Sequence, residues 1–160
     1  MEIVGEKTTC YSYFAIVSDG ELIDGRGVVS HAKNGFDPAY ITKKLGIEPF
    51  RAWKLGDLRR CGGSRYGFSS WAACRQEEPA LDVGEQCLNI VRELRDKIPI
   101  LLELKQEYDL NFGITIVPSI YSGEGPALYF NHEIIEFCYL TGAEIGIDMY
   151  IYGFQEERFD

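Results

Sequence analysis

Histidine is scarce in this chain, and its scarcity narrows the chemistry that the sequence can support. Only two histidines, His31 and His132, occur among 160 residues, although histidine is the usual proton-transfer group near neutral pH. His132 and Glu136 are four residues apart and could share a helical face, but no Cys-x-x-Cys or His-Glu-x-x-His pattern supplies further metal ligands. We therefore predict no catalytic set, no metal site and no cofactor, and we favour a non-enzymatic protein.

Long apolar runs and targeting segments are also missing. The first residues, Met-Glu-Ile-Val-Gly-Glu, lack the basic and apolar regions of a secretory signal. No stretch approaches the roughly 20 apolar residues that a membrane span needs. The five cysteines are odd in number and widely spread, as in proteins whose thiols stay reduced. We expect a cytoplasmic protein that does not act at membranes.

Common catalytic motifs are absent as well. The sequence has no Gly-x-Ser-x-Gly, P-loop or dinucleotide-binding glycine pattern. Cys138 lies six residues beyond His132, so the two would not share a helical face. Cys61, among Arg59, Arg60 and Arg65, is the better candidate for a reactive thiol, because nearby cations lower a thiol pKa. An exposed loop cysteine without a role is the simpler interpretation.

Positive charge is in the minority. Sixteen Lys and Arg stand against 25 Asp and Glu, which gives a net charge of −9. An acidic protein repels phosphate backbones and anionic lipids, so we expect neither nucleic acid nor membrane as a partner. The charge suits a basic protein partner, although solubility alone also accounts for it.

What the chain does have is enough apolar material for one domain, which we place over residues 1–160 with its core at about 10–152. Hydrophobic residues make up 46% and aromatic residues 13% of the sequence. We predict strands at 10–17, 66–74, 112–117, 127–130 and 144–152, a hairpin at 21–29 and an extended loop at 50–65. Residues 82–98 have the apolar stripe of an amphipathic helix, and Pro99 opens a further helix.

Two short helices of similar design are predicted far apart in the chain. Asp37 can cap the first and Gly46 can end it, while Asn131 and Gly142 do the same for the second. The repeated design indicates pseudo-repeated strand–helix–strand units. We therefore predict an α+β fold in which helices pack on one face of a mostly antiparallel sheet.

The most distinctive local feature is a basic and aromatic segment. Between residues 50 and 65 five cations stand against Asp57 alone, a local charge of +4, so the remaining residues carry −13. Arginine and tryptophan are typical of binding hot spots. Arginine also binds phosphates and carboxylates, so an alternative function is a small-molecule-binding or hydrolytic domain that uses the segment from Arg51 to Trp71 for an anionic ligand. Alternatively, the cations neutralise the acidic surface while the tryptophans pack in the core. Our candidate ligand- or partner-binding residues are Arg51, Trp53, Lys54, Asp57, Arg59, Arg60, Arg65, Trp71, Asp148 and Tyr150.

Asp148 and Tyr150 belong to the last predicted strand and extend that candidate surface. Their side chains alternate with a row of apolar side chains along the strand. They should therefore form either an open polar-aromatic face or an interface, and a homodimer could use that interface. Only the position of Asp148 on this face supports a role for it as a general acid or base.

The sequence resembles the domain of unknown function 4279 family. The resemblance lies in Phe36-Asp-Pro-x-x-Ile-Thr-x-x-Leu-Gly-Ile-x-Pro49, in Gly56-Asp57, in Trp71 followed by a long helix, and in an ending with Gly142, Ile147, Asp148 and Tyr150. It spans residues 11–152, and residues 21–34 are longer than the link expected there. The resemblance implies a small intracellular bacterial α+β protein and brings no catalytic residues. By analogy, an immunity-type protein that neutralises a toxin would suit such a chain.

Overall fold

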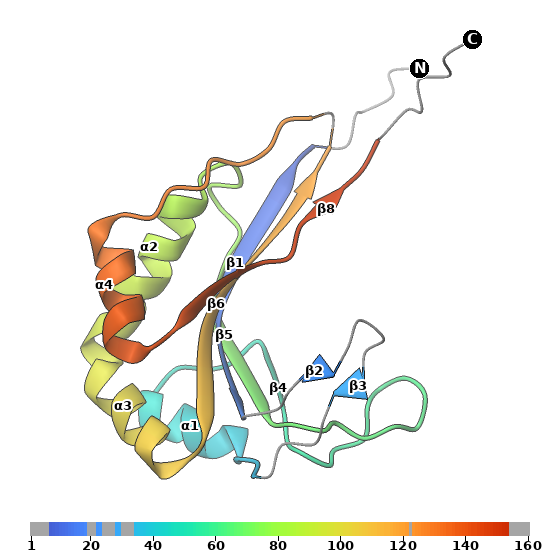
Figure 1. Cartoon of the computed structure of the whole chain (residues 1–160), viewed down its shortest axis with the longest axis vertical. Coiled ribbons are helices and arrows are strands. Elements are labelled where there is room, and N and C mark those ends of the chain that lie inside the picture. The colour runs from blue at the N-terminus through green and yellow to red at the C-terminus, as the bar shows by residue number, and fades with distance from the viewer. Residues whose placement is uncertain (1–6, 19–21, 24–27, 30–33, 122, 154–160) are drawn as a thin grey trace.

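The computed structural model describes residues 7–18, 22–23, 28–29, 34–121 and 123–153. The chain has an α+β fold, as predicted: one mixed sheet carries helices on one face (Figure 1). The helices are α1 (Pro38–Leu45), α2 (Val83–Leu94), α3 (Ile98–Glu107) and α4 (His132–Thr141). The strands lie in the order β4 (Arg51–Trp53), β5 (Ser70–Gln76), β1 (Thr9–Ser18), β6 (Leu110–Ile120) and β7 (Glu144–Ile147), and β8 (Tyr150–Ile151) also pairs with β6.

The sheet is built around β1, which pairs antiparallel with both β5 and β6. This confirms the strand predicted at residues 10–17 and places it at the centre of the sheet. Its side chains alternate in burial: Phe14 and Ile16 are fully buried, whereas Tyr11 and Tyr13 are only partly buried. The helices therefore cover one face of β1, and the other face stays open.

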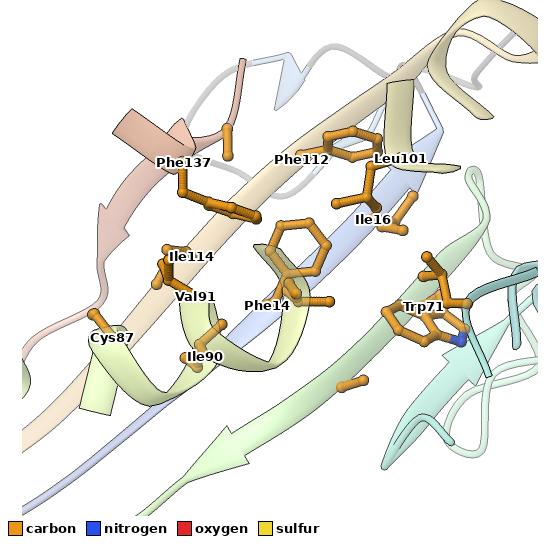
Figure 2. Packing of buried hydrophobic residues seen from close by; sticks show 14 of the residues in the cluster. Phe14, Ile16, Trp71, Cys87, Ile90, Val91, Leu101, Phe112, Ile114 and Phe137 are labelled. Carbon is orange, nitrogen blue, oxygen red and sulfur yellow. The ribbon is translucent and has the colours of Figure 1, made fainter. Parts of the chain in front are cut away.

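The core lies between β1, β6 and the helices (Figure 2). Phe14 is at its centre, with ring centroids 5.8 Å from Phe112 and 6.0 Å from Phe137. The apolar stripe predicted for residues 82–98 is confirmed, since α2 buries Val83, Cys87, Ile90, Val91 and Leu94. Burial of this stripe removes apolar surface from water, which is the main favourable contribution to folding.

Gln86 is a polar residue within this core, and it fastens α2 to β1. Its side-chain amide donates hydrogen bonds to the carbonyl oxygens of Cys10 (2.9 Å) and Pro79 (3.0 Å). Its side-chain oxygen accepts a hydrogen bond of 2.7 Å from the hydroxyl of Ser12. Because both ends of the buried amide are paired, its burial costs little free energy.

The two capped helices are confirmed in detail. In α1 the Asp37 carboxylate accepts from the Ala39 amide, and Gly46 ends the helix with φ 67°. In α4 the Asn131 side chain accepts from the Ile134 amide, and Gly142 ends the helix with φ 71°. Each helix lies in the chain between a long central strand and a short strand of the same direction, because β4 and β1 are both antiparallel to β5 while β7 is parallel to β6. The hairpin at 22–29 also lies between β1 and α1.

Other boundaries differ from the prediction. Residues 51–53 of the predicted loop form β4, an edge strand too short to show a side-chain period. The strand predicted at 66–74 is β5, which begins at Ser70. Residues 127–130 form no strand; Ala127 makes only an isolated bridge to Asp82. The hairpin is confirmed by the antiparallel pairing of β2 (Leu22–Ile23) and β3 (Val28–Val29), while its connecting residues 24–27 and His31 lie outside the described residues.

The predicted strand at 144–152 is divided by a proline in its neighbour. Both β7 and β8 pair with β6 at the same offset, as in the pairs Ile147 with Ile116 and Tyr150 with Ser119. At this offset the Asp148 carbonyl faces the nitrogen of Pro118, which has no hydrogen to donate. One ladder bond is therefore missing, and the two strands continue along the same edge of the sheet with an interrupted ladder.

None of the helices within the described ranges has both the length and the apolarity needed to cross a lipid bilayer.

Candidate aromatic surface

The uncovered face of the sheet carries a continuous group of aromatic and arginine side chains, which we call the aromatic face. It consists of side chains from β1, from β4 and its flanks, from the loop before β5 and from β5 itself: Tyr11, Tyr13, Phe50, Arg51, Trp53, Arg59, Tyr66, Phe68 and Arg75. The elements bring together residues that are up to 64 positions apart, from Tyr11 to Arg75.

Arg51 occupies the middle of this surface. Its guanidinium carbon lies 5.3 Å from the ring centroid of Tyr13, 5.6 Å from that of Phe50 and 5.7 Å from that of Trp53. Its Nη2 also donates a hydrogen bond of 3.0 Å to the Tyr13 hydroxyl. Cation–π attraction and this hydrogen bond hold the guanidinium among the three rings, and the hydrogen bond uses only one of its five N–H donors.

A second group of rings adjoins Arg51. Trp53 stacks on Tyr66 with centroids 4.3 Å apart and an interplanar angle of 13°, and it meets Phe68 edge-on at 5.6 Å. Arg59 lies 5.2 Å from the Tyr66 centroid. In the described part of the chain, the indole nitrogen of Trp53 is a buried donor without a hydrogen-bond partner.

A β-bulge brings Arg75 onto the same face. Phe14 is opposite Ala73 and Ser12 is opposite Gln76, so β5 contains one more residue than β1 between these pairs. Cys74, with φ 59°, takes up the extra position and packs partly against the core. Because side chains alternate along a strand, the bulge turns Arg75 outward, where its guanidinium carbon lies 4.1 Å from the Tyr11 centroid.

The three arginines differ in their acidic neighbours. Arg75 forms an ion pair of 2.9 Å with Glu77. Within the described residues, no carboxylate lies within 4.0 Å of Arg51 or Arg59. Arg51 and Arg59 therefore place positive charge on the face with no counter-ion from the described part of the chain, although the whole chain is strongly acidic.

Three other predicted site residues hold the loop in place. Lys54 pairs with the carboxylate of Asp37 at 3.0 Å. Asp57 accepts a hydrogen bond of 2.8 Å from the Lys54 amide, and Arg65 donates one of 2.7 Å to the Gly56 carbonyl. These contacts fix the segment that carries Trp53 and Tyr66. Arg60 is exposed at the tip of the same loop.

Trp71 requires a correction to the candidate set. It is fully buried on the helix-facing side of β5, and its indole nitrogen donates a hydrogen bond of 3.0 Å to the Thr42 hydroxyl of α1. Ala72 and Trp71 are neighbours on a strand and so face opposite sides of the sheet. Trp71 therefore belongs to the core and is separate from the aromatic face.

Asp148 and Tyr150 lie at the opposite edge of the sheet from β4. The Tyr150 hydroxyl donates a hydrogen bond of 3.2 Å to the Asp148 carboxylate, and this interaction raises the pKa of Tyr150. The structure thus brings this pair together but does not bring it to Arg51.

The candidate thiols and histidine do not meet. Cys61 is exposed in the loop. Burial raises the pKa of Cys74 and Cys138, and it raises the pKa of Cys87 to about 12, which disfavours their thiolate forms. Over the described residues, no three His, Cys, Asp or Glu side chains gather as metal ligands. His132 lies instead beside Glu136 at an open hollow of about 450 Å³ on α4.

Several residues of the aromatic face were missed in the sequence. Tyr11 and Tyr13 alternate with buried residues, and this i, i+2 repeat was a usable signal, but a strand that is apolar throughout also fits burial on both sides. Phe50 precedes a strand that has no readable period. Arg75 depends on a bulge, which alternation cannot predict.

These features define a class of α+β protein in which helices cover one sheet face and arginine-bearing aromatic side chains occupy the other. The family model described as Domain of unknown function (DUF4279) matches residues 8–152, nearly the whole chain, and the chain belongs to this family. This confirms the resemblance drawn from residues 36–49 and from the later motifs. Searches of curated proteins and of solved structures found no match.

Proposed function

We propose that this chain is a non-enzymatic binding protein and that the aromatic face is its contact surface. The observation that carries the proposal is Arg51, which lies against three rings and a tyrosine hydroxyl on the face that no helix covers. Tyrosine, tryptophan and arginine dominate binding hot spots because they combine large contact area with directional hydrogen bonds. Here they are also held in place before a partner arrives, which lowers the entropy cost of binding.

The kind of partner follows from the charge of the remaining surface. Outside residues 50–65 the chain carries −13, so the aromatic face belongs to a molecule whose net charge is strongly negative. Long-range attraction then favours a basic protein, and the rings and arginines supply short-range contacts. An immunity-type protein that neutralises a basic toxin is the form of this function that we propose. The same charge opposes nucleic acid as a partner.

A pull-down with matched variants tests this proposal. Tagged wild type, Arg51→Ala and Arg92→Ala would each be incubated with native lysate at low and at high salt. Arg92 is exposed on α2, so its loss changes the net charge equally without touching the aromatic face. We expect wild type and Arg92→Ala to retain a stoichiometric protein that Arg51→Ala loses by at least about tenfold. No such protein at either salt, or equal retention by Arg51→Ala, would contradict the proposal.

A second candidate function is the binding of a small anionic ligand. It is favoured by the absence of carboxylates near Arg51 and Arg59 in the described residues, because an unpaired guanidinium binds phosphate or carboxylate well. A thermal-shift screen of nucleotides and sugar phosphates tests it, since a specific ligand in excess stabilises the folded state. A ligand that stabilises wild type and Arg92→Ala but not Arg51→Ala would favour this candidate, and a flat screen would count against it.

A further inference from the structure

We propose that two copies of this chain associate through the edge formed by β7 and β8, so that their sheets join into one continuous sheet. This contact uses the edge opposite β4 and is independent of the binding proposed for the aromatic face. It concerns a different set of residues, and each proposal can fail without the other.

The backbone at this edge has unused hydrogen-bonding groups. The amides of Asp148 and Tyr152 donate to the carbonyl oxygens of Ile116 and Ile120 on β6, at 2.8 and 2.9 Å. In a parallel ladder, alternate residues direct both their N–H and C=O groups to the same neighbour. Ile145, Ile147, Met149 and Ile151 therefore direct theirs away from the sheet.

The edge is long and unprotected in the described part of the chain. Because β7 and β8 share one offset on β6, they continue along the same side of β6, with residues 148–149 outside the two strands. In Figure 1 the segment 144–152 crosses in front of β1 and β6, and no described segment crosses in front of it. It contains neither lysine nor proline, the residues that soluble proteins commonly use to prevent edge pairing.

Exposed apolar side chains occur on this strand edge and on the helix that precedes it. On the helix-facing side, Ile147 is 43% and Ile151 50% exposed. The helix α4, which leads directly into β7, leaves Ile135 54% and Tyr139 86% exposed, and both line the open hollow beside His132. Strand edge and helix together present apolar side chains that remain exposed among the described residues.

A second copy covers all of these groups at once. When two identical edges pair antiparallel, the two-fold axis stands perpendicular to the sheet, so both helix layers stay on the same side. The two α4 helices then approach each other above the joined strands. A stable interface buries about 800 Å² per partner, and the exposed side chains at the edge and on α4 would supply apolar surface to it.

The charges at the edge select one register. In this register Ile147 of one copy lies opposite Ile147 of the other, and the outward backbone groups pair. Ile145 of one copy then faces Met149 of the other, and Glu144 faces Tyr150. Shifting the pairing register by two residues in one direction places Glu144 of one copy opposite Asp148 of the other. Shifting it by two residues in the other direction places the Asp148 side chains of the two copies opposite each other. Both shifts bring like charges together, which disfavours them.

Sedimentation velocity on the whole chain tests the association. At about 100 μM, where an interface of this size associates, we expect wild type to sediment as a dimer. Ile147→Lys adds a charge at the centre of the edge and should give a monomer with unchanged circular dichroism. Leu58→Lys is the control, because Leu58 is 62% exposed in the loop at the other edge. A monomeric wild type, or a dimer that Ile147→Lys leaves intact, would overturn the proposal.

Cross-linking tests the register without a destabilising charge. In a Cys61→Ser background, Ile147→Cys should form a covalent dimer on mild oxidation, because residues opposite each other in a hydrogen-bonded pair have Cα atoms about 5.5 Å apart, within disulfide range. Leu58→Cys in the same background should cross-link far less. Equal cross-linking of the two variants would contradict pairing at this edge.

Discussion

At the scale of single residues, Trp71 illustrates a hydrogen bond that joins helix and sheet. Its buried indole nitrogen donates to the Thr42 hydroxyl, so the ring fixes α1 against β5. We predict that Trp71→Phe lowers the free energy of unfolding by about 1–3 kcal/mol, because it removes this bond and part of the buried ring. Urea unfolding followed by circular dichroism would measure the change.

A double-mutant cycle with Thr42→Val separates these two causes. If the hydrogen bond matters, the loss in Trp71→Phe/Thr42→Val is smaller than the sum of the two single losses, because either change alone removes the same bond. Strictly additive losses would assign the effect to packing alone.

The cysteines give a second prediction at this scale. Burial raises the pKa of Cys10, Cys74, Cys87 and Cys138, whereas Cys61 is exposed. A protonated and buried thiol reacts slowly. We therefore expect an aromatic disulfide reagent at pH 8 to modify Cys61 rapidly and the other four only on unfolding. Cys61→Ser should abolish the rapid phase, and a rapid phase that persists in this variant would contradict the assignment.

At the scale of secondary-structure elements, the two capped helices differ in how they depend on pH. The Lys54 ammonium and the Ala39 amide both bind the Asp37 carboxylate and lower its pKa, with Lys54 the larger cause. A carboxyl group whose pKa is lower in the folded state stabilises that state above its unfolded pKa of about 3.9 and loses this effect as the pH falls further. The cap of α4 is the neutral Asn131, which has no such dependence.

Asp37→Asn keeps a capping side chain and removes the charge. We expect it to lower the melting temperature at pH 7, and we expect the difference from wild type to shrink as the pH falls below about 4. Melting curves measured by circular dichroism between pH 7 and pH 2 would follow this difference. A difference that stays constant over the whole range would exclude the carboxylate as its source.

The elements also differ in how much the sequence reveals about them. Helix ends were predictable because Asp37, Gly46, Asn131 and Gly142 act on their own neighbours. The strand β4 and the bulge at Cys74 were not, because both arise from pairing with residues distant in sequence. For the same reason Arg51 and Trp53 could be selected as candidates from their composition, whereas the contact of Arg51 with Tyr13 required the sheet.

At the scale of the whole molecule, the central strand separates the buried core from the aromatic face. Phe14 and Tyr13 are neighbours on β1, but Phe14 faces the core and Tyr13 faces the open side beside Arg51. The helix-facing residues supply most of the buried apolar surface, and the uncovered residues keep part of theirs in water. A substitution at one of these two positions should therefore affect a different property from a substitution at the other.

We predict that Phe14→Ala lowers the free energy of unfolding by about 3–5 kcal/mol, because it leaves a cavity among Phe112 and Phe137. Tyr13→Ala should cost about 1 kcal/mol, since it loses only partly exposed ring contacts with Phe50 and Arg51. Urea unfolding measures both values. If Tyr13→Ala proved as destabilising as Phe14→Ala, the aromatic face would be a second core rather than a surface kept for a partner.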